Sequence, residues 1–313
     1  MAGPEEVWLS VVNGVANPGP VHFIIGTGRC GSTLVHEVIC RHPSVAFLSN
    51  IDDLLPGAYR LSRVNGPLFR RLPASSSVKG RLRFAPSEGY RVSTREVGTI
   101  LALSRRDLAA TDATPWLTAR LAEFVARRAI RQPGKSFIHK LTGWPRAGLL
   151  HAVFPEARFV HVVRDGRAVA NSWLKTDWWR GYEGPSAWQW GELPDDYAKL
   201  WETTGHSFPM LAGIGWMILI DAWQAVRQTI PESQRLEVRY EDIVERPEKE
   251  FDRITAFLQL EGDAGFVKRI EGNHFARDRG RKTIKDLSPA DLEVMTEAMA
   301  GHLEEYGYPT GLV

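Results

Sequence analysis

Short apolar runs alternate with stretches of helical periodicity along much of this chain. The first run covers residues 21–25 and stops at a glycine-rich loop, after which a helical pattern continues to Arg41 and a second apolar run follows at 45–48. Short apolar runs separated by helices are typical of strands buried in a parallel sheet. The pattern therefore predicts an α/β fold that begins as strand, glycine loop, helix and strand.

The same alternation returns in the second half of the chain. Pro247 stands in the first turn of one expected helix, and Ser288-Pro289 begins the last one; both are favourable helix starts. We predict further strands at 137–139, 158–163 and 236–240, and helices at 146–154, 166–176, 247–260 and 288–305.

Two stretches break this alternation. Residues 56–95 are rich in Gly, Pro, Ser and Arg, and residues 177–207 are rich in Trp and Gly. We expect both to be loop-rich insertions over the active-site edge of a P-loop-like parallel sheet flanked by helices, because ligands bind at the carboxyl edge of such sheets. No internal repeat or low-complexity linker divides the chain, so residues 1–313 are predicted to form a single domain.

Charge and cysteine content narrow the class of protein. Lys and Arg total 39 and Asp and Glu total 37, whereas a general nucleic-acid binder usually has a larger basic excess, so we expect no nucleic-acid partner. Cys30 and Cys40 are too few for a disulfide scaffold and fit a reducing compartment.

The sequence also predicts a cytoplasmic location. The first ten residues lack the basic and apolar regions of a signal peptide. The longest apolar run, at about 208–220, is too short to span a bilayer, so no transmembrane segment is expected. The oligomeric state stays open.

The loop after the first expected strand carries the clearest chemical signal. The segment GTGRCGST at 26–33 nearly matches the phosphate-binding loop GxxxxGK[ST], with Ser32 in place of the Lys and with Arg29 as a cation inside the loop. Its backbone N–H groups and the following helix N-terminus still form an anion cradle. We expect a phosphate-like group to be held by Gly28, Arg29, Cys30, Gly31, Ser32 and Thr33.

A second anion site is expected after the strand at 158–163. Arg164 follows this strand, and Ser172 lies eight residues later on the next helix. A cation at the carboxyl edge of a strand and a hydroxyl two turns along a helix can point at one phosphate. The alternative is that Asp165 caps the helix and that Arg164 is a solvated charge.

These segments resemble the sulfotransferases that use 3′-phosphoadenosine 5′-phosphosulfate (PAPS). FIIGTGRCGSTLV is similar to their 5′-phosphosulfate loop, in the Arg form of the tyrosylprotein and carbohydrate enzymes. RFVHVVRDGRAVANS resembles their 3′-phosphate signature, and LEVRYEDIVERPEKEFDRITAFLQL resembles their strand-Tyr-Glu-Asp-Leu segment. The resemblance covers about residues 21–50, 136–176 and 236–305.

The resemblance implies PAPS as co-substrate and no required metal. It places Arg164 and Ser172 on the 3′-phosphate and Tyr240 near the nucleotide. It also implies a basic loop with Arg281 and Lys282 that closes over the nucleotide.

The implied reaction moves a sulfuryl group to a hydroxyl, which requires a base and cations near the developing negative charge. Lys140 stands where the family places a Lys or a His at a strand end, and with Arg29 it is an expected cation. Related enzymes carry a Glu just after the second strand, but this chain has no Glu there. Asp52 is the first choice for the base and Asp53 the second, with His139 as the competitor.

Two other functions stay open. The strand before Arg164-Asp165 can be read as the metal-binding strand of a P-loop kinase or NTPase acting on a nucleotide, with Asp165 on Mg²⁺. The missing loop Lys argues against that function. The third hypothesis is an anion-binding module without catalysis.

The acceptor is expected to be a small molecule, a lipid or a carbohydrate. Six Trp residues lie between Trp173 and Trp201, and their faces suit sugar rings, phenols or acyl chains. They could equally pack a long lid onto the body. His36, Glu37 and Cys40 nearly match the metal motif HExxH, but no third ligand is evident and no metal site is expected.

Overall fold

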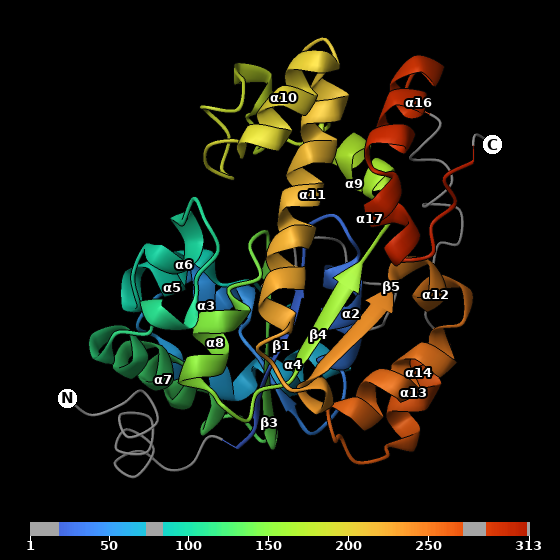
Figure 1. The fold of residues 1–313 in the computed structure, drawn as a ribbon. Coiled ribbons are helices and arrows are strands. Elements are labelled where there is room, and N and C mark those ends of the chain that lie inside the picture. The colour runs from blue at the N-terminus through green and yellow to red at the C-terminus, as the bar shows by residue number, and fades with distance from the viewer. Residues whose placement is uncertain (1–18, 73–83, 272–285, 312–313) are drawn as a thin grey trace.

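A parallel sheet of five strands runs through the part of the chain that the computed structural model describes, residues 19–72, 84–271 and 286–311. The strand order is β2-β3-β1-β4-β5, and every pair of neighbours is parallel. This confirms the predicted α/β sheet (Figure 1). The strands are β1 (Val21–Gly26), β2 (Val45–Ala46), β3 (Ser136–Thr142), β4 (Phe159–Val163) and β5 (Arg235–Arg239).

Strand β3 is longer than the sequence predicts. The expected strand covered 137–139, but the ladder between β1 and β3 continues to the pair Gly26 and Thr142. Lys140 therefore lies inside the strand, opposite Ile24 of β1, and does not follow the strand's end as expected. The prediction missed this extension because a strand buried on both faces is usually an apolar run, whereas His139 and Lys140 are polar.

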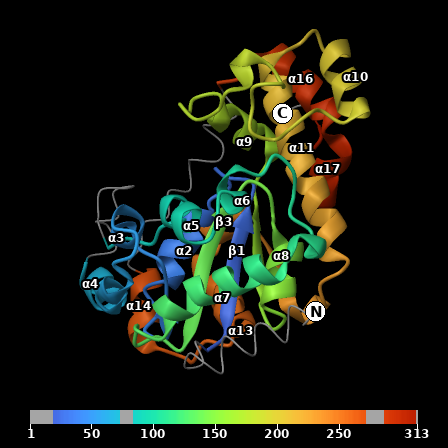
Figure 2. The same ribbon diagram turned by 90° about the vertical axis from the view of Figure 1, so that its left-hand side faces the viewer.

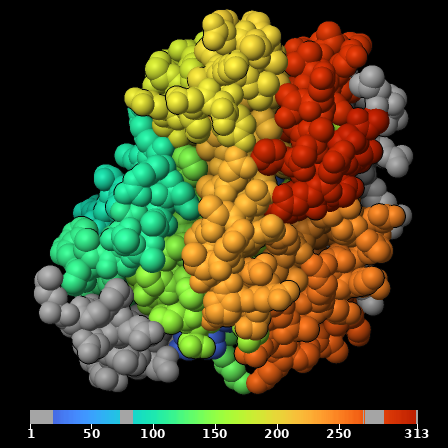
Figure 3. Space-filling view, viewed as in Figure 1, coloured from blue at the N-terminus to red at the C-terminus, as the bar shows by residue number. Residues whose placement is uncertain are grey.

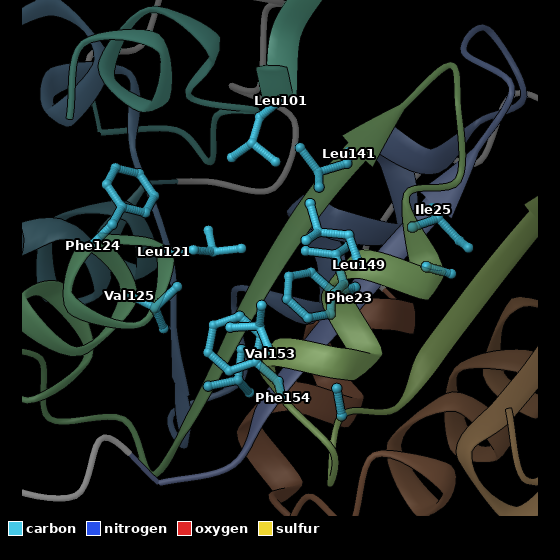
Figure 4. Packing of buried hydrophobic residues seen from close by; sticks show 14 of the residues in the cluster. Phe23, Ile25, Leu101, Leu121, Phe124, Val125, Leu141, Leu149, Val153 and Phe154 are labelled. Carbon is cyan, nitrogen blue, oxygen red and sulfur yellow. The ribbon is translucent and has the colours of Figure 1, made fainter. Parts of the chain in front are cut away.

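Helices cover both faces of the sheet, and the alternation of side chains along β1 divides the core accordingly. Phe23 and Ile25 join one cluster, with side chains of α7 (Pro115–Ala129) and α8 (Ala147–Val153). Figure 4 shows this packing. Ile24 joins the cluster on the opposite face, whose helices are α2 (Ser32–Ile39), α13 (Pro247–Phe257) and α14 (Ala264–Glu271).

A third hydrophobic cluster lies beyond the carboxyl ends of the strands. In Figure 1 the arrowheads of β4 and β5 point toward the helices that build it. The expected last helix at 288–305 is two helices, which meet at Met299. The helices of this cluster are α9 (Gly166–Trp173), α10 (Asp195–Thr203), α11 (Phe208–Arg227), α16 (Pro289–Ala298) and α17 (Ala300–Glu305).

Helix α11 extends the predicted apolar run to 20 residues. By length and by a mean hydropathy of 1.3 it could cross a membrane, yet 67% of its most apolar window is buried inside the protein. It packs against α9 and α16, and Figure 3 shows it between the green segments and the red C-terminal helices. A buried core helix passes the same length and hydropathy test, and the burial of α11 fits such a helix.

The two expected insertions contain short helices as well as loops (Figure 2). The first holds η1 (Tyr59–Val64), α4 (Asn65–Arg71) and most of α5 (Tyr90–Glu96). Just before it, Ser49 and Asp52 form a capping box at the start of α3 (Asn50–Leu54), and α6 (Ile100–Leu103) follows it. The second holds η4 (Gly181–Glu183) and α10.

Removal of the Phe23 ring tests the core packing beneath the site. The ring centre lies 5.7 Å from that of Phe154 and 5.6 Å from that of Phe159. We expect Phe23→Ala to lower the free energy of unfolding by about 3–5 kcal/mol, because it leaves a cavity in a packed core. Urea denaturation measures this, with Leu103→Ala at a 70% exposed position as control. Equal, small losses in both variants would contradict the assignment of Phe23 to the core.

Candidate active site

The loop between β1 and α2 has the backbone shape of an anion cradle. Gly28, Arg29 and Gly31 have φ angles of 79°, 56° and 96°. Left-handed residues in such a turn direct successive N–H groups toward one side, where they can bind an anion together. Arg29 adopts this conformation without being glycine, which costs about 1–2 kcal/mol. The local backbone therefore fits the phosphate-like ligand predicted from the sequence.

Tyr240 packs directly against this loop. It is the first residue of α12 (Tyr240–Glu245), and a Cβ on Gly31 would lie 2.1 Å from its Cδ2 atom. Only glycine allows this approach. The guanidinium carbon of Arg164 lies 4.7 Å from the centre of the same ring. Tyr240 thus contacts both predicted anion sites.

The two predicted anion sites also contact each other directly. Arg164 Nη1 donates to the carbonyl oxygen of Arg29 at 3.1 Å, and Arg29 Nε donates to Ser172 Oγ at 2.9 Å. Burial and, after it, the charge of Arg164 lower the pKa of the Arg29 guanidinium from its usual value. An anion bound near both side chains would offset this repulsion between their positive charges.

Arg164 and Asp165 have different environments. Arg164 is 8% exposed, so it is not a solvated charge. Asp165 caps α9 by accepting a hydrogen bond from the backbone N–H of Arg167 at 3.0 Å, as the alternative interpretation held. Its other oxygen pairs with Arg167 Nη2 at 2.8 Å. The capping role of Asp165 and the nucleotide role expected of Arg164 are therefore compatible.

Lys140 lies between the glycine loop and the carboxylate of Glu88, which is not among the site residues predicted from the sequence. Its Nζ donates to Thr33 Oγ1, in the first turn of α2, at 2.8 Å and pairs with Glu88 Oε1 at 2.6 Å. The Lys140 side chain is 5% exposed and that of Glu88 is 27% exposed. In the sequence, Glu88 is only the single acid of a cation-rich stretch, and no motif marks it.

Asp52, the first choice for the base, belongs to a buried network. The residue is 3% exposed. Oδ1 accepts a hydrogen bond from Ser62 Oγ at 2.5 Å, and Oδ2 accepts from Ser49 Oγ at 2.9 Å and Asn65 Nδ2 at 2.6 Å. These bonds join α3, η1 and α4. The role of Asp52 as base stays a prediction, but its carboxylate already has several donors.

Asp53, the second choice, caps a helix. Its Oδ1 atom accepts hydrogen bonds from the backbone N–H groups of Arg91 and Val92 at 2.9 and 3.0 Å, at the start of α5. The role of Asp53 as base also stays a prediction. The contacts give it a structural task outside the reaction.

His139, the competitor for the base, is buried and 6% exposed. Burial, followed by the charges of Lys140, Arg128 and Arg146, lowers its pKa to about 3. Its ring stacks on Phe137 with centres 6.5 Å apart. An imidazole with such a low pKa is a weak proton acceptor, so its environment suits a neutral core residue better than a base.

The remaining residues predicted to bind the nucleotide include Cys30 and Ser32 of the glycine loop, and Arg281 and Lys282. The Cys30 side chain is fully buried, and a Cβ on Gly26 would lie 2.5 Å from its Sγ atom, so only the Cys30 backbone can meet a ligand at the loop surface. Ser32 is buried at the start of α2. Arg281 and Lys282 lie outside the described residues, as do three cations of the Arg-rich stretch, Lys79, Arg81 and Arg83.

Most of the clustered Trp residues pack within the protein. Trp173 is fully buried, and its ring centre lies 5.2 Å from that of Trp190 and 6.1 Å from that of Trp178. Its Nε1 atom lies 3.9 Å from the position of a Cβ on Gly28, so the end of α9 contacts the glycine loop. Trp179, Trp188 and Trp190 are also buried, whereas Trp178 is 45% exposed.

Two residues of the sequence on α2 that nearly matches HExxH, His36 and Cys40, are buried. His36 is 1% exposed, and burial and then the charge of Lys140 hold its pKa well below its usual value. Cys40 is a free, buried cysteine. Within residues 19–72, 84–271 and 286–311, no group of three or more His, Cys, Asp or Glu side chains is placed to hold a metal ion.

Comparison with known proteins gives one family. A model of the sulfotransferase family matches residues 20–264. Two solved structures share the fold at 15% sequence identity. Sulfotransferase STF9 from Mycobacterium avium matches with a TM-score of 0.54 over 97% of this chain and 82% of its own. Sulfotransferase STF1 from Mycobacterium tuberculosis H37Rv matches with a TM-score of 0.52 over 95% of this chain and 82% of its own. At this identity they show the fold alone. No curated protein matches the chain.

The low pKa of His139 predicts a pH dependence of stability. Its folded-state pKa of about 3 lies below the ordinary value of 6.5, so the folded protein binds fewer protons than the unfolded chain, and stability falls as the pH drops below 6.5. Between pH 7.5 and 5 this group removes about 2 kcal/mol. We expect the free energy of unfolding of His139→Phe, measured by urea denaturation, to fall by about 2 kcal/mol less than that of the wild type over this pH range. Parallel curves for the two proteins would contradict a neutral, buried His139.

Proposed function

The chain belongs to the sulfotransferase family, and we propose that it transfers the sulfuryl group of PAPS to a hydroxyl of a small-molecule, lipid or carbohydrate acceptor and releases adenosine 3′,5′-bisphosphate (PAP). The contact between the two anion sites carries this proposal. Arg164 binds the Arg29 carbonyl and Arg29 binds Ser172, so both sites belong to one continuous surface. A nucleotide with negative charge at its 5′ and 3′ positions matches such a pair of sites.

We assign each end of the nucleotide to one of the two sites. The 5′-phosphosulfate belongs on the backbone N–H groups of residues 28–33 and the N-terminus of α2, where left-handed backbone and helix dipole both favour an anion. The 3′-phosphate belongs on Arg164 and Ser172. Tyr240 supports both through its packing against Gly31 and Arg164. Arg281 and Lys282 are proposed to close over the nucleotide.

Sulfuryl transfer requires positive charge where negative charge develops. PAPS supplies the activated sulfuryl group. Arg29 and Lys140 are the cations at the loop, and we propose that they stabilise the transferring group and the leaving phosphate oxygen. Lys140 contacts Thr33 in the loop's helical turn, which supports this role. A sulfuryl group is less negative than a phosphoryl group, so the proposal requires no metal ion.

The alternative function, a P-loop kinase or NTPase, would require Asp165 to bind Mg²⁺. Both of its carboxylate oxygens already pair with Arg167, Oδ1 with Nε at 3.0 Å and Oδ2 with Nη2 at 2.8 Å. Ser32 also replaces the loop Lys that such enzymes place on the nucleotide phosphates. Both observations favour sulfuryl transfer over phosphoryl transfer.

The acceptor class is proposed from two exposed aromatic side chains of the second insertion. Trp178 and Tyr182 are 45% and 53% exposed. Trp178 packs edge-on against Trp173, which contacts the glycine loop at Gly28. We propose that Trp178 contacts the acceptor, because an aromatic face suits a sugar ring, a phenol or an acyl chain that carries the hydroxyl.

A cytoplasmic location forms part of the same proposal. Cys30 and Cys40 are both free and buried. Reduced cysteines are the rule in reducing compartments, which supports this location.

Ligand-dependent stability tests the nucleotide assignment. We expect PAP at about 100 times its dissociation constant to stabilise the protein by about 2.7 kcal/mol, and Mg·ATP at the same concentration to have a much smaller effect. Thermal unfolding with each ligand measures this. Ser172→Ala should weaken the PAP effect because a hydroxyl donor is lost. Ser44→Ala serves as control, because Ser44 lies just before β2, at the amino end of the sheet, where its carbonyl accepts hydrogen bonds from the N–H groups of Lys135 and Ser136. Stabilisation by Mg·ATP alone would favour the kinase or NTPase alternative.

Transfer of ³⁵S from PAPS tests the assigned cations. We expect Lys140→Met to lower kcat by about 10²–10³-fold, the usual effect of removing one donor from a developing charge. Lys135→Met is the matched control, because Lys135 pairs with Glu261 at 2.7 Å just before β3 and its side chain is 69% exposed. Equal activities of the two variants would refute the role of Lys140.

A further inference from the structure

We propose that Glu88 is the general base that accepts the proton of the acceptor hydroxyl. The proposal rests on the proposed sulfuryl transfer and assigns to Glu88 the role that was expected of Asp52, Asp53 or His139. Its basis is the ion pair of Glu88 with Lys140 beside the glycine loop, together with the partial exposure of the Glu88 side chain.

Backbone pairing brings Glu88 to the edge of the sheet. Ser87 N–H donates to the Leu48 carbonyl at 2.8 Å, and Asn50 N–H donates to the Ala85 carbonyl at 2.9 Å. The segment before Glu88 therefore runs antiparallel to residues 48–50, which follow β2. Residues 49–53, which follow β2, contain no Glu, and the segment paired with them places Glu88 beside this region.

Lys140 links Glu88 to the glycine loop. A lysine ammonium has three N–H donors. Among the described residues, two of them go to Thr33 Oγ1 at 2.8 Å and Glu88 Oε1 at 2.6 Å. The third donor can serve an oxygen of a ligand in the loop. A ligand oxygen and the Glu88 carboxylate would then share one ammonium group, which places the carboxylate beside the site of transfer.

The other candidate bases are less available. The Asp52 carboxylate is buried with hydroxyl, amide and backbone donors, and Asp53 caps α5. His139 is buried and its ring stacks on Phe137, which is the environment of a core residue. The Glu88 side chain is 27% exposed and remains reachable by a hydroxyl that approaches the loop.

In the proposed step, the acceptor hydroxyl takes the sulfuryl group of PAPS and loses its proton to Glu88. The acceptor oxygen forms a bond to sulfur while the bond between sulfur and the bridging oxygen of PAPS breaks. The electron pair of that bond goes to the 5′-phosphate of PAP. The hydroxyl proton goes to a carboxylate oxygen of Glu88, and Lys140 stays protonated throughout.

The Glu88→Gln variant distinguishes two roles of Glu88: accepting the proton of the acceptor, or only positioning Lys140. The Gln side chain keeps a carbonyl oxygen that can accept the Lys140 hydrogen bond, but it cannot take a proton. We expect PAP formation from PAPS, with a mixture of 4-nitrophenol, 1-octanol and methyl β-glucoside, to fall about 10²–10⁴-fold. PAP formation counts transfer to every hydroxyl present, water included. Glu261→Gln, in the Glu–Lys pair before β3, should retain wild-type activity.

Two further readouts identify a base specifically. The wild-type rate should fall at acidic pH, and Glu88→Gln should lack this fall. Added formate should restore part of the activity of Glu88→Ala, because a small carboxylate can occupy the vacated space and accept the proton. A Glu88→Gln variant with more than a tenth of wild-type activity, or an unchanged pH profile, would overturn the proposal.

Failure of this proposal and failure of the proposed function give different results. If the wild type forms PAP and Glu88→Gln forms it equally well, the transfer stands and the base lies elsewhere. If the wild type binds no PAP and forms none, the proposed function fails and the base assignment fails with it. Thermal stabilisation of Glu88→Gln by PAP, equal to that of the wild type, shows that its nucleotide site is intact.

Discussion

The close approach of the glycine loop to Tyr240 is the constraint on which the rest of the site depends. The Tyr240 ring fills the space where a side chain on Gly31 would stand, and Arg164 lies over the same ring. This packing fixes the left-handed backbone of the loop, brings the Arg29 carbonyl to Arg164, and holds two cations side by side. The positive charges of Arg29 and Arg164 disfavour each other, so bound negative charge would stabilise this arrangement.

The strand order explains why residues far apart in the chain meet at this loop. β1 lies at the centre with β3 and β4 as its neighbours, and all three strands point the same way. The glycine loop follows β1, Lys140 comes from β3 on one side, and Arg164 follows β4 on the other. Parallel strands bring their carboxyl ends to one edge, where ligands of α/β proteins bind. The fold thus supplies both the cradle and its flanking cations.

The strands, loops and helices that carry the candidate site residues follow the predicted order, because that order is a local feature of the sequence. The glycine loop, and Arg164 with Ser172 eight residues later, depend on backbone geometry within one strand–loop–helix unit, and the structure brings them into contact. The length of β3 and the place of Glu88 depend on tertiary pairing. Because Lys140 is polar, the sequence pattern does not indicate that the buried strand continues past it. Glu88 lies at the site because its segment pairs with residues 48–50. No spacing rule in a single sequence records such a contact.

The central claim is that one nucleotide bridges the glycine loop and Arg164. Isothermal titration of the wild type with PAP and with adenosine 5′-phosphate tests it most directly, since the two ligands differ only in the 3′-phosphate. Two charge-assisted contacts to that phosphate predict that adenosine 5′-phosphate binds about 100-fold more weakly or worse. Equal affinities for the two ligands would show that Arg164 and Ser172 bind no phosphate and would contradict the account.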